Sequence, residues 1–181
     1  MPFTPYHFGP SSFIALVFRK WLDIPVFVLA NIIVDLEVLV IRLLRIGWPM
    51  HRYLHTLLIG AAAGTVWALA AYPLRHLFKR LMQFLRIPYQ TTLLKMIVSG
   101  ILGVWLHVVI DAIYHWDVHL FWPLNTNKRP LYGLLTRQHV EALCIAFFIA
   151  AVILWLATAV SYSKRKTVKE AASNGKDQIF H

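Results

Sequence analysis

The chain has 181 residues, of which 59% are hydrophobic and only 14% charged, and its formal net charge is +10. Soluble domains carry about 25% charged residues, so this composition excludes a soluble globular protein. The basic residues lie between apolar runs and in the C-terminal segment, which fits membrane topology better than nucleic-acid binding. The single cysteine, Cys144, excludes an intramolecular disulfide and a zinc-finger thiolate site.

Five apolar runs and one amphipathic segment follow along the chain. Residues 11–21 form a short run that predicts a half-span or a tilted first helix. Residues 24–44, 54–74, 93–114 and 140–162 reach the length of about 20 residues that a spanning helix needs. Residues 75–87 place apolar and basic side chains on opposite sides and predict an interfacial helix. The sequence therefore predicts an all-α, polytopic membrane helix bundle with four to five membrane helices and one interfacial amphipathic helix.

The polar C-terminal segment helps to predict the orientation. We expect residues 1–162 to form a membrane-embedded domain and residues 163–181 to form a basic, disordered cytoplasmic tail. With that tail inside and the four long runs alternating, twelve Lys and Arg residues lie inside and six outside. This bias favours a cell inner or plasma membrane protein with a cytoplasmic C-terminus.

Histidines and carboxylates occur within the apolar runs, where a charge costs about 2.5–3.5 kcal/mol at mid-helix and commonly marks function. His51 and His55 are four residues apart, so we expect both rings on one helix face. His107 and Asp111 repeat this spacing in another run. In the alternating topology, all four side chains lie toward the outer side of the membrane.

Two acids lie close together in the second apolar run. Asp35 and Glu37 are two residues apart, about 200° around a helix, so both cannot face one ion on a regular helix. Asn31 lies one turn before Asp35 on the same face, which favours Asp35. A set of imidazoles and carboxylates suits zinc, with manganese or iron as alternatives. The sequence therefore predicts a divalent metal site toward the outer face, with ligands Asp35, His51, His55, His107 and Asp111.

Several segments together resemble a known family, the predicted membrane-bound metal-dependent hydrolases of the YdjM-like group. The family pattern has an N-terminal histidine, an Asp-x-Asp element, a His-x-x-x-His-Thr element and a His-x-x-x-Asp helix, followed by a loop that ends in Trp-Pro. The matching segments are PYHFGP at 5–10, VDLE at 34–37, HRYLHT at 51–56, HVVID at 107–111 and FWP at 121–123. The resemblance covers about residues 1–125, and it departs from the pattern at Glu37 and Val38. The ligand order is also similar to the helical zinc-dependent phospholipase C fold, although 139–141 lacks the spacing of that fold's later His-x-x-x-Glu element.

The resemblance implies a hydrolase in which a metal ion activates a water molecule. It adds His7 to the candidate ligands. Asp117, His119 or Glu37 would orient ligands or act as general base, and Arg52 would hold an anionic group. From the membrane location we expect membrane lipid as a partner, a lipid or lipid-linked (phospho)ester as substrate, and no nucleic acid.

Two other functions remain open for the same residues. A small ion or proton transporter would use them as a relay, although four or five helices without an internal repeat are few for a transporter. A structural membrane protein would use the metal only to staple helices, with closed coordination.

Overall fold

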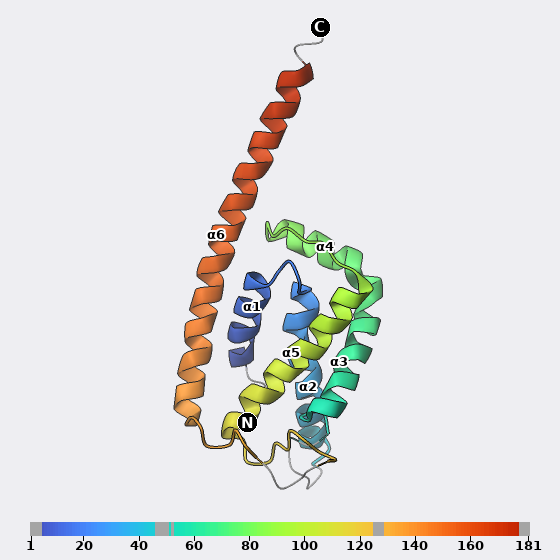
Figure 1. Cartoon of the computed structure of the whole chain (residues 1–181), viewed down its shortest axis with the longest axis vertical. Helices are drawn as coiled ribbons and strands as arrows, with labels where there is room; N and C mark the ends of the chain where they lie inside the picture. The colour runs from blue at the N-terminus through green and yellow to red at the C-terminus, as the bar shows by residue number, and fades with distance from the viewer. Residues whose placement is uncertain (1–4, 46–50, 52, 125–128, 178–181) are drawn as a thin grey trace.

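A computed structural model of the chain describes residues 5–45, 51, 53–124 and 129–177, with side chains up to residue 164. All the regular elements in these residues are helical, which confirms the predicted all-α fold. The helices run up and down in alternation (Figure 1). The loop between α5 (Leu93–Tyr114) and α6 (Arg137–Asp177) lies at one end of the bundle, which we call the loop end. The helix α4 (Arg75–Phe84) lies across the opposite end.

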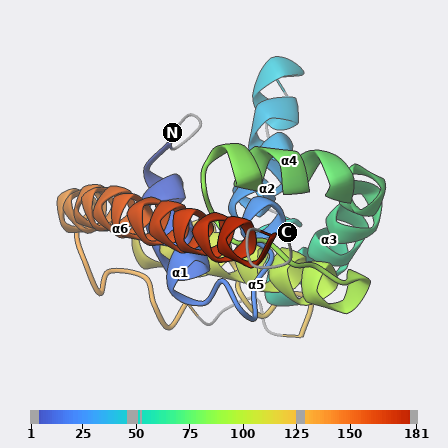
Figure 2. The same cartoon turned by 90° about the horizontal axis from the view of Figure 1, so that it is seen from above.

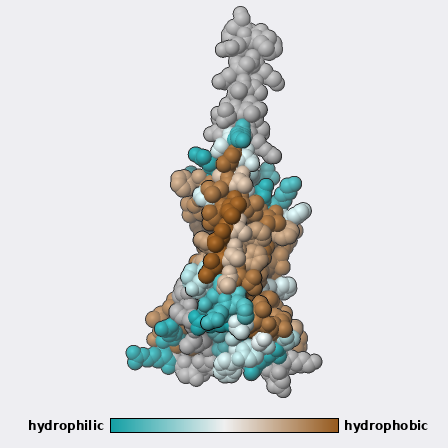
Figure 3. All heavy atoms as spheres, turned by 90° about the vertical axis from the view of Figure 1, so that its left-hand side faces the viewer, coloured by the Kyte–Doolittle hydropathy of each residue, from teal (hydrophilic) through white to brown (hydrophobic). Residues whose placement is uncertain are grey.

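Four helices among the described residues are long and apolar enough to cross a membrane. They are α2 (Ile24–Leu43), α3 (Leu57–Ala71) with its continuation to Phe84, α5 (Leu93–Tyr114), and the first part of α6 (Arg137–Asp177). The first helix, α1 (Phe8–Val17), has ten residues and is therefore about 15 Å long. The structure thus has a short first helix, as predicted, although it begins and ends earlier than the predicted residues 11–21. An apolar surface covers the middle of the molecule on the face that carries α6 (Figure 3).

Side-chain caps set where three of the long helices begin. Asp23 accepts a hydrogen bond from the backbone N–H of Val26 at the start of α2. Thr56 does the same for α3, and Thr92 for α5. Each cap satisfies a backbone donor that the first turn of a helix leaves without an intrahelical partner.

The α5 helix lies between α2 and α3 and contacts both closely. Gly64 of α3 and Gly100 of α5 face each other so closely that a Cβ atom on either would overlap the backbone of the other. Gly103 makes the same close approach to Phe27 of α2. Polar residues in the second half of α5 can therefore meet side chains from both neighbouring helices.

The amphipathic helix α4 (Arg75–Phe84) follows α3 after the short 3₁₀ turn η2 (Tyr72–Leu74). It crosses the end of the bundle, as the view from above shows (Figure 2). Phe78 and Met82 are buried against the bundle, whereas Lys79 and Arg80 face outward. The structure thus confirms the amphipathic helix predicted over residues 75–87.

The last helix, α6, is longer than the sequence predicted. Its backbone continues to Asp177, over most of the segment that composition assigned to a disordered tail. Lysine and alanine, which recur in residues 164–176, are strong helix formers and permit this continuation. Near its middle, the Trp155 indole N–H donates to the carbonyl of Leu85 and joins α6 to the end of α4.

Candidate metal centre

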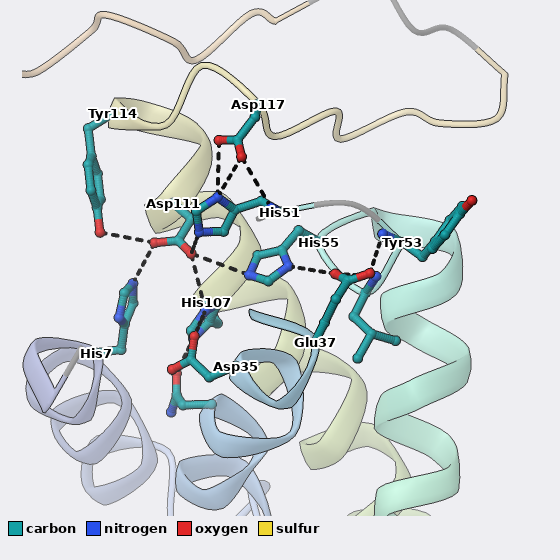
Figure 4. Close-up of polar contacts among 12 residues, drawn as sticks. His7, Asp35, Glu37, His51, Tyr53, His55, His107, Asp111, Tyr114 and Asp117 are labelled. Atoms are coloured by element: carbon teal, nitrogen blue, oxygen red, sulfur yellow. Dashed lines mark hydrogen bonds and ion pairs between the residues drawn. The ribbon is translucent and has the colours of Figure 1, made fainter. Parts of the chain in front are cut away.

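Asp111 lies at the centre of a buried cluster of imidazole rings near the loop end (Figure 4). The residue is only 2% exposed, and four histidines direct Nε2 toward its carboxylate. The distances from these Nε2 atoms to the nearer Asp111 oxygen are 3.1 Å for His7, 3.2 Å for His107, 3.5 Å for His55 and 3.8 Å for His51.

The cluster is assembled from segments far apart in the chain. His7 ends the 3₁₀ turn η1 (Pro5–His7), immediately before α1. His107 and Asp111 lie one turn apart on α5, as their spacing predicted.

His51 and His55 do not lie on a helix, contrary to the prediction from their spacing. Both precede α3, whose cap is Thr56. The reason is that Glu37 of α2 accepts the backbone N–H groups of Tyr53 and Leu54, which holds this segment outside the helix. The two rings still meet, with their centroids 4.6 Å apart.

The rings of His51, His55 and His107 are also held from the outside through Nδ1. The partners of these Nδ1 atoms are the Asp117 carboxylate for His51 at 3.0 Å, the Glu37 carboxylate for His55 at 3.1 Å, and the Asn31 carbonyl oxygen for His107 at 3.3 Å. An outer acceptor on the second ring nitrogen is the usual surrounding of a metal-binding histidine, because it fixes both the tautomer and the orientation of the ring.

The outer contacts determine where the ring protons lie. Ionised carboxylates only accept hydrogen bonds, so Nδ1 of His51 and of His55 carries the proton. Asn31 donates through Nδ2 to Ser11 and to the carbonyl of Val28, which leaves its Oδ1 to accept from His107.

Neutral rings of this tautomer direct an Nε2 lone pair at the Asp111 carboxylate. Among the described residues, Nε2 of His55 and of His107 makes no hydrogen bond of good geometry. Two acceptors in contact repel unless positive charge lies between them. Either additional ring protons or a metal ion can supply that charge.

Three overlapping groups of ligand atoms surround this point, and each can hold a metal ion. Within each group, one atom per residue lies within 4.8 Å of the others. The groups are His7 with His107 and Asp111, Asp35 with His55 and His107, and His51 with His55 and Asp111. The structure thus brings all six residues that we proposed as ligands into one cluster.

The two acids of α2 point to different places. Oδ1 of Asp35 lies 3.4 Å from Nε2 of His107, at the centre of the cluster. Glu37 instead contacts Nδ1 of His55 and the backbone before α3. The helical separation of the two acids accounts for this difference.

The loop after α5 brings Asp117 onto the cluster. Its carboxylate contacts Nδ1 of His51 and accepts the backbone N–H of the same residue. Burial alone would raise the pKa of Asp117, but the hydrogen bonds from His51 outweigh it and lower the pKa to about 2. His119 lies in the same loop and belongs to none of the ligand groups found among the described residues. Arg52, our candidate for holding an anionic group, lies outside the described residues.

Two residues beside the cluster were not among the predicted site residues. The Tyr114 hydroxyl donates to Oδ1 of Asp111 at 3.1 Å, from one turn further along α5. His115 lies against His51, with ring centroids 4.1 Å apart. Burial and the neighbouring His51 lower the pKa of His115 to about 4, so its ring is neutral at physiological pH. Their positions three and four residues after Asp111 are the signal that could have identified them.

Comparison of this chain with family models, with curated proteins and with solved structures found no match. The resemblance to the YdjM-like group therefore stays a prediction from the motifs.

Proposed function

We propose that the chain is a membrane-bound, metal-dependent hydrolase that acts on a lipid or lipid-linked (phospho)ester. The proposal of a metal ion rests on the contact of four histidine Nε2 atoms with the buried carboxylate of Asp111. The rings of His51, His55 and His107 are also oriented from outside. A set of nitrogen and oxygen ligands without thiolate favours zinc, with manganese or iron as alternatives.

Six converging ligands are more than one structural zinc ion needs, since a closed site takes four. The surplus supports an open position or a second ion. A bound ion would lower the pKa of its water toward neutrality and polarise the scissile carbonyl or phosphoryl oxygen. Glu37 and Asp117 hold histidine rings from outside, whereas Asp35 and Asp111 face the centre. Outer carboxylates that orient the histidine ligands are typical of metal sites.

The outer residues divide the supporting roles. Glu37 and Asp117 each accept a ring N–H and a backbone N–H, which suits ligand orientation rather than proton transfer. His119 is then our candidate general base, because its Nδ1 is buried and makes no hydrogen bond among the described residues.

An apolar groove supports a lipid substrate. It has a volume of about 540 Å³ and lies along α1 and α5. Val109, which lines it, lies at the same level of α5 as His107 and Asp111 but about 200° around the helix from them. An acyl chain in the groove would therefore run along the helix that carries the central aspartate. The lining residues are Ile14, Phe18, Trp21, Leu22, Phe27, Leu102, Trp105, Leu106 and Val109.

The distribution of lysine and arginine along the chain supports one orientation in the membrane. It favours a cytoplasmic C-terminus, which directs the loop end and the metal centre toward the outer face of the cell inner or plasma membrane.

Metal content tests this function. The full chain is purified in detergent and its metal is measured by elemental analysis, together with His55→Ala, Asp111→Ala and the matched control His76→Ala, whose ring is exposed on α4. We expect metal in the wild type and in His76→Ala and little in the other two variants. If all four carry equally little metal, the metal centre is wrong.

A panel of ester and phosphoester substrates then separates hydrolysis from stapling. Turnover that is lost in Asp111→Ala supports the hydrolase. Metal binding without any turnover would instead favour a structural membrane protein whose metal staples helices. One observation favours that second candidate: His7, His55 and His107 are all buried to 1% exposure or less, as in a closed site.

A further inference from the structure

His51, His115 and Asp117 form a further group of ligand atoms on the loop side of the metal centre. One atom from each lies within 4.8 Å of the others. His51 and Asp117 contact each other at 3.0 Å, and the ring of His115 lies against that of His51. We call these three residues the outer triad. His115 has no place in the proposed centre, so the triad needs its own explanation.

The outer triad lies between water and the metal centre. His55 and His107 are 0% exposed and Asp111 is 2% exposed, so an ion cannot reach them directly. His115 is only half-buried, and it follows α5 at the loop end. His51 and Asp117 are 5% and 7% exposed, so His115 is the member of the triad that an ion from this side meets first. A proposed metal site needs such a path.

His51 belongs to both groups. Its Nδ1 contacts Asp117, while its Nε2 points toward Asp111 at 3.8 Å, the longest of the four central contacts. A neutral imidazole has one lone pair and one N–H, so this ring can ligate only one ion at a time. An ion in the outer triad must therefore leave His51 before the same ring can serve the centre.

We propose that the outer triad is a transient acceptor position through which a divalent cation is loaded into the central site. The inference rests on the proposed metal centre and deepens it. The triad replaces part of the hydration shell of the ion before burial. With an ion in the triad, Nδ1 of His51 would be the ligand and the ring proton would lie on Nε2, facing the Asp111 carboxylate. When the ion moves to the centre, the proton would return to Nδ1, where Asp117 accepts it, and Nε2 would become the ligand.

A residue that acts only on the path has a characteristic kinetic signature. It changes the rates of uptake and release by the same factor, because the dissociation constant is their ratio and the final site is unaltered. A residue that ligates the ion in its final position changes the dissociation constant instead. His115 can therefore be tested without knowledge of the substrate.

The test uses the full chain in detergent, stripped of metal and mixed with buffered Zn²⁺ while a fluorescent indicator reports free zinc. Uptake, release into a chelator and the equilibrium dissociation constant are measured for the wild type and His115→Ala. A matched control is His139→Ala, since His139 is exposed at the start of α6 and contacts Thr136. His115→Cys keeps a metal-binding side chain at the position.

We expect His115→Ala to slow uptake and release alike by about tenfold, or about 1.4 kcal/mol at the barrier, with an unchanged dissociation constant. His115→Cys should restore much of the rate, and His139→Ala should match the wild type. Equal rates in His115→Ala and wild type would overturn the inference, as would a weaker dissociation constant with unchanged uptake. Neither result contradicts the proposed metal centre. That proposal would be contradicted if the wild type took up no zinc.

Discussion

The carboxylate of Glu37 holds His55 through both its ring and its backbone segment. Oε2 of Glu37 lies 3.1 Å from Nδ1 of His55 and accepts the N–H of Leu54, and Oε1 accepts the N–H of Tyr53. A single side chain of α2 thus shapes the segment before α3 and aims one ring of that segment at Asp111.

We predict that Glu37→Gln weakens zinc binding by about 10- to 100-fold, the usual effect of losing an outer contact to a metal ligand. An amide cannot accept from the ring and both backbone groups as the carboxylate does. Competition with a chelator of known affinity measures the change. Glu141→Gln is the control, because the structure pairs Glu141 with Arg137 on α6 and places it in no ligand group of the described residues. Equal dissociation constants in the two variants would show that Glu37 has no orienting role.

Zinc should stabilise the folded protein. At a free concentration 100 times the dissociation constant, a ligand that binds only the folded state adds about 2.7 kcal/mol to the free energy of unfolding. We expect the thermal midpoint of the stripped protein to rise with zinc, and Asp111→Asn to abolish the rise. His76→Ala should keep it. An equal rise in Asp111→Asn would place the binding elsewhere.

The contact between α1 and α6 positions His7. Gly9 lies directly against the backbone of α6. A Cβ atom added to Gly9 would overlap the carbonyl oxygen of Cys144 and would lie 2.9 Å from the backbone nitrogen of Phe148. Gly9→Ala forces these helices apart, so we predict a loss of about 1–3 kcal/mol of stability together with weaker zinc binding. Ala146→Val on the exposed side of α6 should change neither. Thermal unfolding and zinc titration of the two variants test this prediction. Normal zinc affinity in Gly9→Ala would show that the packing of α1 on α6 does not affect the metal centre.

Asp23 is a buried acid that belongs to none of the ligand groups found among the described residues. Besides its cap on α2, it accepts hydrogen bonds from the hydroxyls of Tyr89 and Thr91. Burial and this carboxylate raise the pKa of Tyr89, which keeps its hydroxyl protonated. We predict that Asp23→Ala loses roughly 2–4 kcal/mol of stability, from the cap and the donors left without an acceptor. Its zinc affinity below the unfolding temperature should equal that of the wild type; a loss like that of Asp111→Ala would contradict this separation.

Local pattern was enough to predict the helices and part of the centre. The spacing of His107 and Asp111 predicted their shared face because both lie inside one regular helix. The same spacing misled for His51 and His55, since a long-range contact from Glu37 decides the backbone there. The outer contacts of the rings could not be predicted, because they depend on the depth at which α2 and the loop after α5 meet. His115 was not among the predicted ligands, although its position four residues after Asp111 could have identified it.

The arrangement of α1 has a mechanical consequence. This half-length helix packs mainly along α6 and also contacts α2, whereas α2, α3 and α5 pack on one another. His7, at the start of α1, reaches across to Asp111 of α5. An ion bound by both residues would cross-link the start of α1, and with it α6, to α5. Removing it would then leave α6, with its long extension beyond the bundle, freer to tilt against the other three.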